Sequence, residues 1–185
     1  VPVQTYDVVV NTATDIHSGA SVLMTGTVVP MFKQTDYNVF VWRNETKIVQ
    51  APVTDNRFTA TFTAYGNVGT EYVLSVQPAN STTYNNVPYY KWTVTKLANV
   101  TLTPIPSVVP TGTVSKLRIK VTYGDQPLIG HQIVGTIQLG TTKTNFTATT
   151  DNKGQVVLDD VALTSVGLAQ ITATISKADG VYGTG

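Results

Sequence analysis

Apolar and polar residues alternate along many short stretches of this chain. Phe58–Thr63 and Tyr72–Val76 show the period of two that is typical of a β-strand with one buried face. β-branched and aromatic residues, which favour strands, dominate these stretches. Further stretches of this kind are residues 21–29, 37–42, 47–50, 88–95, 100–103, 117–122, 132–139, 146–150, 155–158 and 171–175. Short strands separated by turn residues predict an all-β chain built from β-sandwiches.

One part of this pattern occurs twice. Asp55–Arg57 precedes Val68–Thr70 and an expected strand, and Asp151–Lys153 precedes Val166–Leu168 and another expected strand. The two copies lie about half the chain length apart. A repeat of this size predicts two tandem immunoglobulin-like β-sandwich domains.

The junction between the domains is expected near Lys96–Asn99, which contains no flexible Gly/Ser tract. This junction divides the chain into a first domain of residues 11–97 and a second domain of residues 98–185. Residues 1–10 form a separate N-terminal segment.

The two copies differ at their ends. The strand at residues 88–95 closes the first copy, whereas the second copy reaches only Gly185. A sandwich short of a strand exposes an apolar cleft and unpaired edges, which invite a strand from another chain. We therefore expect the second domain to be incomplete, with an acceptor groove that a strand of another subunit completes.

The N-terminal segment is the expected donor of that strand, because it opens with the same Val-Pro pair that begins the closing strand of the first copy. Two alternating faces are available to fill a groove, and the sequence does not fix the register: Val1 and Val3 lie on one face, and Tyr6, Val8 and Val10 on the other. Such a contact is head to tail and builds an open filament of identical subunits unless it closes into a ring.

Two other interpretations stay open. The N-terminal segment can be the first domain's own edge strand, with Val181 and Tyr182 beginning a short closing strand. The chain would then be a monomeric adhesin or surface-layer module. Alternatively, Tyr89, Tyr90 and Trp92 could form the platform of a carbohydrate-binding module, although aromatic packing between strands is the simpler interpretation.

Composition narrows the function classes. Charged residues make up 12% of the chain and the net charge is +1, so there is no basic stripe for nucleic acid and no polybasic membrane patch. There is no cysteine, which excludes disulfides and thiol nucleophiles. A surface of Thr, Ser and Asn titrates little, so we expect tolerance to acid.

Chemistry-bearing motifs are absent from the sequence. The histidines, His17 and His131, lie one in each domain, and no nucleophile elbow, zinc-protease motif or phosphate loop is present. We therefore expect no enzyme activity, no metal and no cofactor. The start at Val1-Pro2, without methionine, predicts a removed secretion signal and an extracellular location.

Four Asn-x-Ser/Thr sequons without a central proline predict N-linked glycans, at Asn44, Asn80, Asn99 and Asn145. Asn44 and Asn80 fall at expected turns, where a glycan is easily accommodated. Asn99 lies at the domain junction, and Asn145 begins an expected strand.

The half of the chain that contains Asp151–Val156 is similar to immunoglobulin-like modules of bacterial and archaeal surface proteins. The whole chain, with its cysteine-free composition, sequons and spare N-terminal strand, resembles the glycosylated pilins of archaeal threads from Sulfolobus-type cells. That resemblance implies subunits joined by donor-strand complementation into an extracellular filament with a role in adhesion or biofilm. Val1–Val10 would be the donor and the second domain the acceptor.

Overall fold

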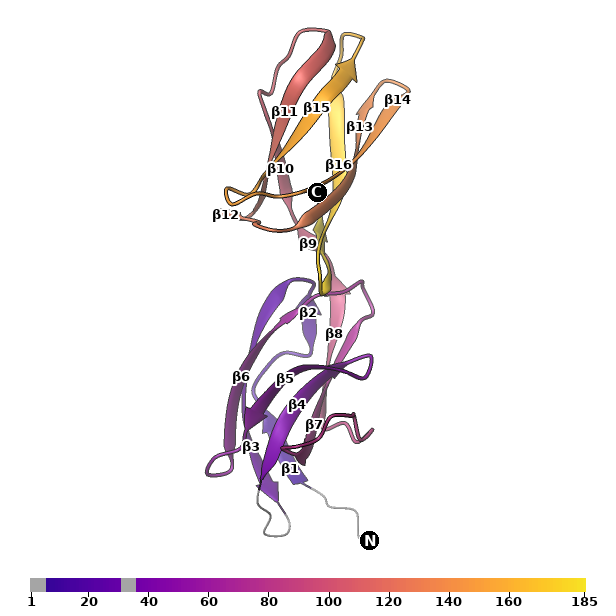
Figure 1. The fold of residues 1–185 in the computed structure, drawn as a ribbon. Coiled ribbons are helices and arrows are strands. Elements are labelled where there is room, and N and C mark those ends of the chain that lie inside the picture. The colour runs from indigo at the N-terminus through magenta and orange to yellow at the C-terminus, as the bar shows by residue number, and fades with distance from the viewer. Residues whose placement is uncertain (1–5, 31–35) are drawn as a thin grey trace. The chain divides into compact units, whose positions relative to one another are not determined.

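The structure is a computed structural model that describes residues 6–30 and 36–185. The chain divides into two compact units, Val1–Lys96 and Leu97–Gly185. The described residues form strands and no helix, so the all-β fold predicted from the alternation is confirmed (Figure 1). They contain no helix with the length and hydropathy of a membrane span.

The strands described in the first unit are β1 (Tyr6–Val10), β2 (Asp15–His17), β3 (Ala20–Pro30), β4 (Tyr37–Arg43), β5 (Thr46–Pro52), β6 (Arg57–Ala64), β7 (Glu71–Pro78) and β8 (Tyr90–Lys96). They form two sheets with the orders β1-β3-β6 and β2-β8-β7-β4-β5. The first strands divide between the layers, because β1 pairs antiparallel with β3 whereas β2 pairs parallel with β8. This is an immunoglobulin-like β-sandwich.

The core of the first unit lies between its two sheets. The Phe62 ring is 5.0 Å from the Tyr72 ring and 5.3 Å from that of Trp92, so aromatic rings from β6, β7 and β8 pack on one another. Edge-to-face and tilted arrangements of this kind stabilise a core beyond the area that they bury. Trp92 is fully buried among them.

The outer face of β4 is also buried, which the simple alternation does not predict. Trp42 donates a hydrogen bond from Nε1 to Ser75 Oγ at 2.8 Å, and Ser75 Oγ donates to Gln77 Oε1 at 2.7 Å. Gln77 Nε2 in turn donates to the Thr83 carbonyl at 2.8 Å, and the Tyr84 ring lies 5.8 Å from Trp42. The segment that follows β7 therefore covers this face of the sheet.

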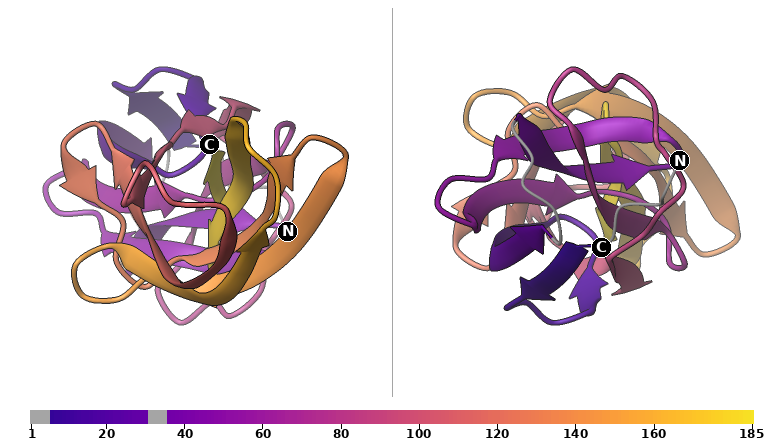
Figure 2. Two further views of the ribbon diagram at one scale, coloured as in Figure 1. Left: turned by 90° about the horizontal axis from the view of Figure 1, so that it is seen from above. Right: turned by 90° about the horizontal axis from the view of Figure 1, so that it is seen from below.

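The strands of the second unit are β9 (Ala98–Asn99), β10 (Thr101–Ile105), β11 (Gly112–Tyr123), β12 (Gln126–Pro127), β13 (Gln132–Leu139), β14 (Thr142–Thr149), β15 (Gln155–Leu163), β16 (Ala169–Lys177) and β17 (Gly180–Thr184). One sheet contains β10, β11, β12 and β15, and the other has the order β14-β13-β16-β17-β9. Figure 2 (left) shows this unit from the end at which β15 turns into β16.

The sequence repeat corresponds to one equivalent connection in each unit. Asp55 and Asn56 turn β5 into β6 with positive φ angles of 51° and 60°. Asp151 turns β14 into β15, where its Oδ1 accepts hydrogen bonds from the backbone N–H groups of Lys153 and Gln155 at 2.8 and 3.0 Å. Asn and Asp suit both turns, because they tolerate left-handed backbone and bond the backbone of their own turn.

Candidate interaction groove

Strand β17 closes only part of the second unit. It pairs with β16 from Lys177 to Thr174, and Gly185 then exchanges two hydrogen bonds with Ala173, of 3.0 and 2.8 Å. Beyond that point, no strand among the described residues pairs with Ala169–Thr172 on the β17 side. Their other side is paired with β13. The expectation that the closing strand is absent was therefore too simple: a closing strand is present, but it is short.

Glycines allow β17 to approach β9 and β10 closely. A Cβ atom on Gly183 would lie 2.2 Å from the Ala98 carbonyl oxygen, and one on Gly185 would lie 2.4 Å from the Val100 carbonyl oxygen. Neither position can take a larger residue without moving the neighbouring backbone. The end of β17 is therefore held against β9 by backbone contact rather than by side chains.

The first unit shows what a complete closing strand does. Strand β8 pairs with β7 as far as Glu71, the first residue of β7, and then continues beyond it. The N–H of Val94 donates to the Thr70 carbonyl at 2.9 Å, and the Gly69 N–H donates to the Val94 carbonyl at 2.8 Å. Trp92 and Val94 are fully buried by this extension.

The matching turn of the second unit has no such strand beside it among the described residues. Val166 and Leu168 are 93% and 92% exposed. Val108, in the loop between β10 and β11, is 84% exposed. Clustered apolar side chains with this exposure mark an interaction surface more often than isolated ones do.

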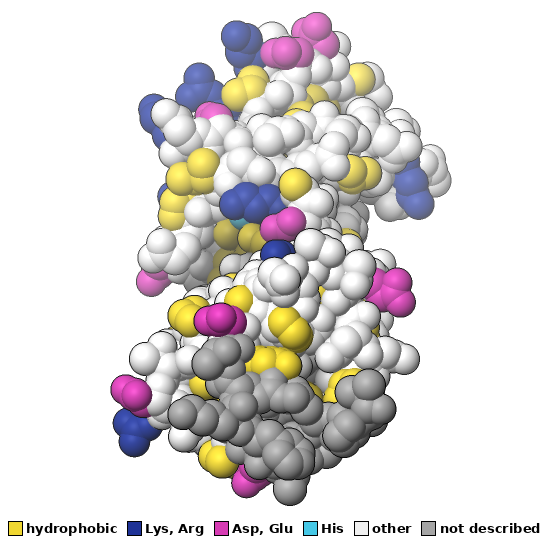
Figure 3. Space-filling model, turned by 60° about the horizontal axis from the view of Figure 1, so that its bottom comes forward, with side chains coloured by type: hydrophobic (Ala, Val, Ile, Leu, Met, Phe, Trp, Pro, Cys, Tyr) yellow, Lys and Arg dark blue, Asp and Glu magenta, His cyan; other side chains and the backbone are white. Residues whose placement is uncertain are grey.

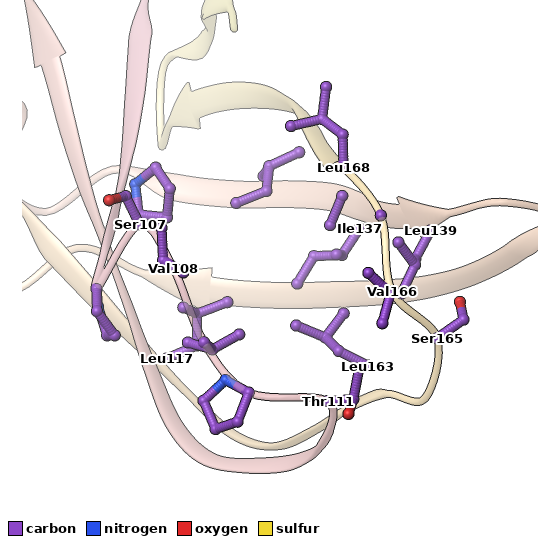
Figure 4. A pocket seen from close by; sticks show the side chains of 17 residues that line it. Ser107, Val108, Thr111, Leu117, Ile137, Leu139, Leu163, Ser165, Val166 and Leu168 are labelled. Atoms are coloured by element: carbon purple, nitrogen blue, oxygen red, sulfur yellow. The ribbon is translucent and has the colours of Figure 1, made fainter.

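These residues form the rim of an apolar groove of about 610 Å³ (Figure 4). Its floor is made by Leu117, Ile137 and Leu139, which are buried. None of its lining residues is charged, and they come from the loops and strands on either side: Pro104, Pro106, Ser107, Val108, Val109, Pro110, Thr111, Leu117, Ile137, Leu139, Leu163, Ser165, Val166, Gly167, Leu168, Ala169 and Ile171. The groove suits an apolar occupant that also brings main-chain hydrogen bonds for β16.

The expected donor residues divide between described and undescribed positions. Val1 and Val3 lie outside the described residues. Tyr6, Val8 and Val10 lie in β1, which pairs with β3 of the same chain, and Val8 and Val10 pack against the core of the first unit. In the isolated chain this strand is therefore the first unit's own edge strand. A role of the segment as donor to a second chain stays a prediction.

All four sequon asparagines are exposed. Asn44 lies in the turn between β4 and β5, and Asn80 follows β7. Asn99 ends β9. Asn145 lies on the edge strand β14, where its Oδ1 accepts a hydrogen bond from Thr136 at 3.1 Å. Their modification by N-linked glycans stays a prediction.

The aromatic platform of the carbohydrate-binding interpretation is not formed. Trp92 is 0% exposed, and the Tyr90 ring packs edge-on against it at 4.8 Å. Tyr89 and Tyr90 pack against the core. A sugar needs an exposed ring face, so these residues serve the core, as the simpler interpretation had it.

On the face shown in Figure 3, basic and acidic side chains are interspersed and form no large patch of one sign. Within residues 6–30 and 36–185, no group of three or more His, Cys, Asp or Glu side chains is placed to hold a metal ion.

His131 is a buried titratable group of the second unit. Its Nδ1 lies 3.2 Å from the Ile129 carbonyl oxygen, which makes Nδ1 the protonated nitrogen, and its ring lies 5.1 Å from that of Tyr182 on β17. Its Nε2 has no hydrogen-bond partner among the described residues. Burial, and then the charge of Lys177, lower the pKa of His131 below its usual value.

Although the low charge predicts tolerance to acid, acidification is expected to destabilise the second unit through the one group His131. Because the pKa is lower in the folded chain, the unfolded chain takes up the proton first, so the free energy of unfolding falls as the pH drops below about 6.5. Thermal melts at pH 7.5 and 5.0 will show this as a lower midpoint. His131→Leu should remove most of the difference and His17→Gln should keep it. An equal pH dependence in both variants would contradict this role.

The rim residues Val108, Val166 and Leu168 were not predicted as site residues from the sequence. The signal available in the sequence was the position of these residues in turns, because valine and leucine are unusual there. The repeat identified Val166–Leu168 as a landmark of the fold but did not indicate that its side chains are exposed.

No protein-family model and no curated protein matches the chain. Among solved structures, the Yersinia pseudotuberculosis adhesin InvE is similar over 96% of this chain and 56% of its own, with 16% identity and a TM-score of 0.48. Fibronectin(III)-like modules of Clostridium thermocellum CbhA match over 97% of this chain and 90% of theirs, with 13% identity and a TM-score of 0.29. The chain thus spans about half the length of the Yersinia protein.

A biofilm-associated protein domain is similar over 95% of this chain and 28% of its own, with 13% identity and a TM-score of 0.31. At these identities the likeness concerns the fold alone.

Proposed function

We propose that this chain is a structural subunit of an extracellular filament, in which β-strand addition joins the subunits head to tail. The observation that carries the proposal is the open half of β16, which lies over an uncharged apolar groove. An added strand supplies main-chain partners on the side of Ala169–Thr172 that is unpaired among the described residues, and its alternate side chains fill the groove. Strand addition is the recognition mode that uses both features together.

A second copy of this chain is the proposed occupant. Its segment Val1–Val10 is apolar at alternate positions and opens with the Val-Pro pair that also precedes β8. Donor and groove lie in different units of the chain, so each copy can donate and accept at once. Such heterologous contacts propagate into an open filament.

The surface composition supports an exposed, external location. Only 12% of the residues are charged, and four exposed sequons are available for N-linked glycans. We propose that a removed signal peptide directs the chain to the cell exterior. The filament would then act in adhesion or biofilm formation.

The second candidate function is a monomeric immunoglobulin-like module of an adhesin or a surface layer. The pairing of β1 with β3 inside the first unit favours it, because that strand is then already in use. The two candidates differ in a property that can be measured directly, which is whether the purified chain polymerises.

The filament proposal predicts that Val166→Asp abolishes polymerisation. A carboxylate at the groove rim opposes an apolar strand, and because Val166 is 93% exposed the variant should still fold. Negative-stain imaging and size exclusion measure the outcome. Val134→Asp is the matched control, since Val134 is an exposed valine of β13 outside the groove. A wild-type chain that stays monomeric at high concentration would contradict the proposal.

A further inference from the structure

One early strand of each unit pairs with its sheet in the same way. Strand β10 pairs antiparallel with the second half of β11, from Thr122 to Arg118, and β1 pairs antiparallel with the second half of β3, from Pro30 to Gly26. The two strands are therefore equivalent elements. Each belongs to the unit whose sheet it joins.

The residues between β8 and β10 belong to the second unit. Only four residues separate Lys96, the last residue of β8, from the start of β10 at Thr101, and among them β9 pairs with β17. In the same way, β1 is occupied in its own unit through its pairing with β3. The part of the expected donor segment that lies ahead of β1 is Val1–Thr5.

We infer that the donor is Val1–Thr5 alone and that β1 stays in its own unit. The donor lies antiparallel to β16, with Val1 opposite Ile171 and Val3 opposite Ala169. This inference rests on the proposed strand addition. It narrows the donor predicted from the sequence from ten residues to five. Val8 and Val10 then keep the core contacts that they make in the first unit.

The length of the segment fits the open edge. The unpaired part of β16 runs over Ala169–Thr172, so it accepts a strand of about the same length. A strand that included β1 would have to break its pairing with β3 and would overrun the start of β16. The five residues ahead of β1 need no such rearrangement.

Hydrogen-bond alternation fixes which residues face the open edge. Gly185 and Ala173 exchange both of their hydrogen bonds, so Ile171 and Ala169 occupy the next two positions of the same kind. Their N–H and C=O groups point toward the donor. Ile171 and Ala169 also line the groove, so the residues opposite them direct their side chains into it.

Val1 and Val3 suit these two positions, and Pro2 suits the position between them. Opposite Gln170, at a non-hydrogen-bonded pair, Pro2 needs no N–H toward β16. A shift by one residue places Pro2 opposite Ile171, loses that hydrogen bond and turns both valines away from the groove. A shift that places Val3 opposite Ile171 puts Val1 opposite Ala173, where Gly185 already lies.

Cysteine cross-linking tests this register, because the chain contains no cysteine. Val3→Cys and Ala169→Cys chains are refolded together and oxidised with oxidised glutathione. Directly opposite residues of a hydrogen-bonded pair have Cα atoms about 5.5 Å apart, within the range of a disulfide. We expect covalent dimers from this mixture and none when Val8→Cys replaces Val3→Cys.

The proposed function is tested separately, by imaging filaments of the unmodified chain. The possible outcomes therefore distinguish a failure of the proposed register from a failure of the proposed function. Filaments together with cross-linking through Val8 would overturn the five-residue donor and leave strand addition standing. Filaments without cross-linking from either mixture would overturn the register. A chain that forms no filaments and no cross-link would overturn both.

A second pair of variants gives an independent check. Val3→Asp should abolish filaments and leave the thermal melt followed by tryptophan fluorescence unchanged, since Trp42 and Trp92 both lie in the first unit. Val8→Asp should lower that melt, because Val8 packs against the same core. If Val8→Asp left the melting midpoint of the first unit unchanged and Val3→Asp lowered it, β1 would not be the strand that remains in its own unit.

Discussion

A copy of Lys91–Lys96 appended directly after Gly185 is expected to complete the second unit from within and to keep the chain monomeric. In the first unit these residues carry Trp92 and Val94, which are fully buried. Because Gly185 pairs with Ala173, the appended Trp and Val fall opposite Ile171 and Ala169, at the two positions that face the groove. The extension therefore has the register of β8.

The expected gain in stability follows from burial. Covering a large apolar side chain contributes about 1.5–3 kcal/mol, part of which offsets the entropy of ordering the added residues. A net gain of only 1 kcal/mol would raise the midpoint of a unit of this size by roughly 5 °C. Calorimetry measures both units, and tryptophan fluorescence identifies the transition of the first, which holds both tryptophans.

The matched control is the same extension with its Trp and Val replaced by serine. It brings the same number of residues and the same charges but nothing to fill the groove, so it should neither stabilise the second unit nor block polymerisation. Equal effects of the two extensions would show that the groove does not recognise apolar side chains. Polymerisation that persisted with the apolar extension would place the subunit contact elsewhere.

Local pattern was sufficient for most of the fold. In β6, Phe58 and Phe62 alternate with polar residues and are buried, as the period of two predicts. Strand β4 departs from this rule, since Val39–Trp42 are all buried. The segment after β7 covers its outer face, and a contact between residues so far apart in sequence leaves no mark on the local pattern.

The candidate site was only partly accessible from the sequence. The repeat directed attention to the end of the second unit, but the sequence did not decide whether Val181 and Tyr182 form a strand. Their pairing in β17 depends on a match with β16 that only the folded chain shows. The shortest strands, β2, β9 and β12, carry too few residues for any periodicity.

For a similar reason, the sequence did not decide whether β1 pairs within its own unit or with a neighbouring one. An alternating apolar segment can complete its own unit or a neighbouring one, because both offer a sheet edge over an apolar layer. Gly26 of β3 allows β1 to come close in its own unit, since a Cβ at that position would lie 2.1 Å from the Val9 carbonyl oxygen. A glycine in a strand interior indicates close backbone approach but not which strand approaches.

Trp92→Ala is expected to destabilise the first unit strongly. The side chain is fully buried between the Phe62 and Tyr90 rings, and removal of a buried aromatic side chain costs about 3–5 kcal/mol. The midpoint of the first unit should fall by roughly 12 °C or more. Trp42 remains as the fluorescent reporter, because it lies in the same unit but in a separate hydrogen-bonded cluster.

Trp92→Phe is the control that isolates the apolar contribution. The indole Nε1 has no hydrogen-bond partner among the described residues, so its replacement by a phenyl ring loses volume but removes a buried donor that is not satisfied there. The phenylalanine variant should therefore melt much closer to the wild type than the alanine variant does. If alanine left the midpoint unchanged, the closing strand of the first unit would not be anchored by its side chains. The second unit, whose closing strand is shorter, would then lose nothing by leaving its groove open, and strand addition would have no apolar driving force.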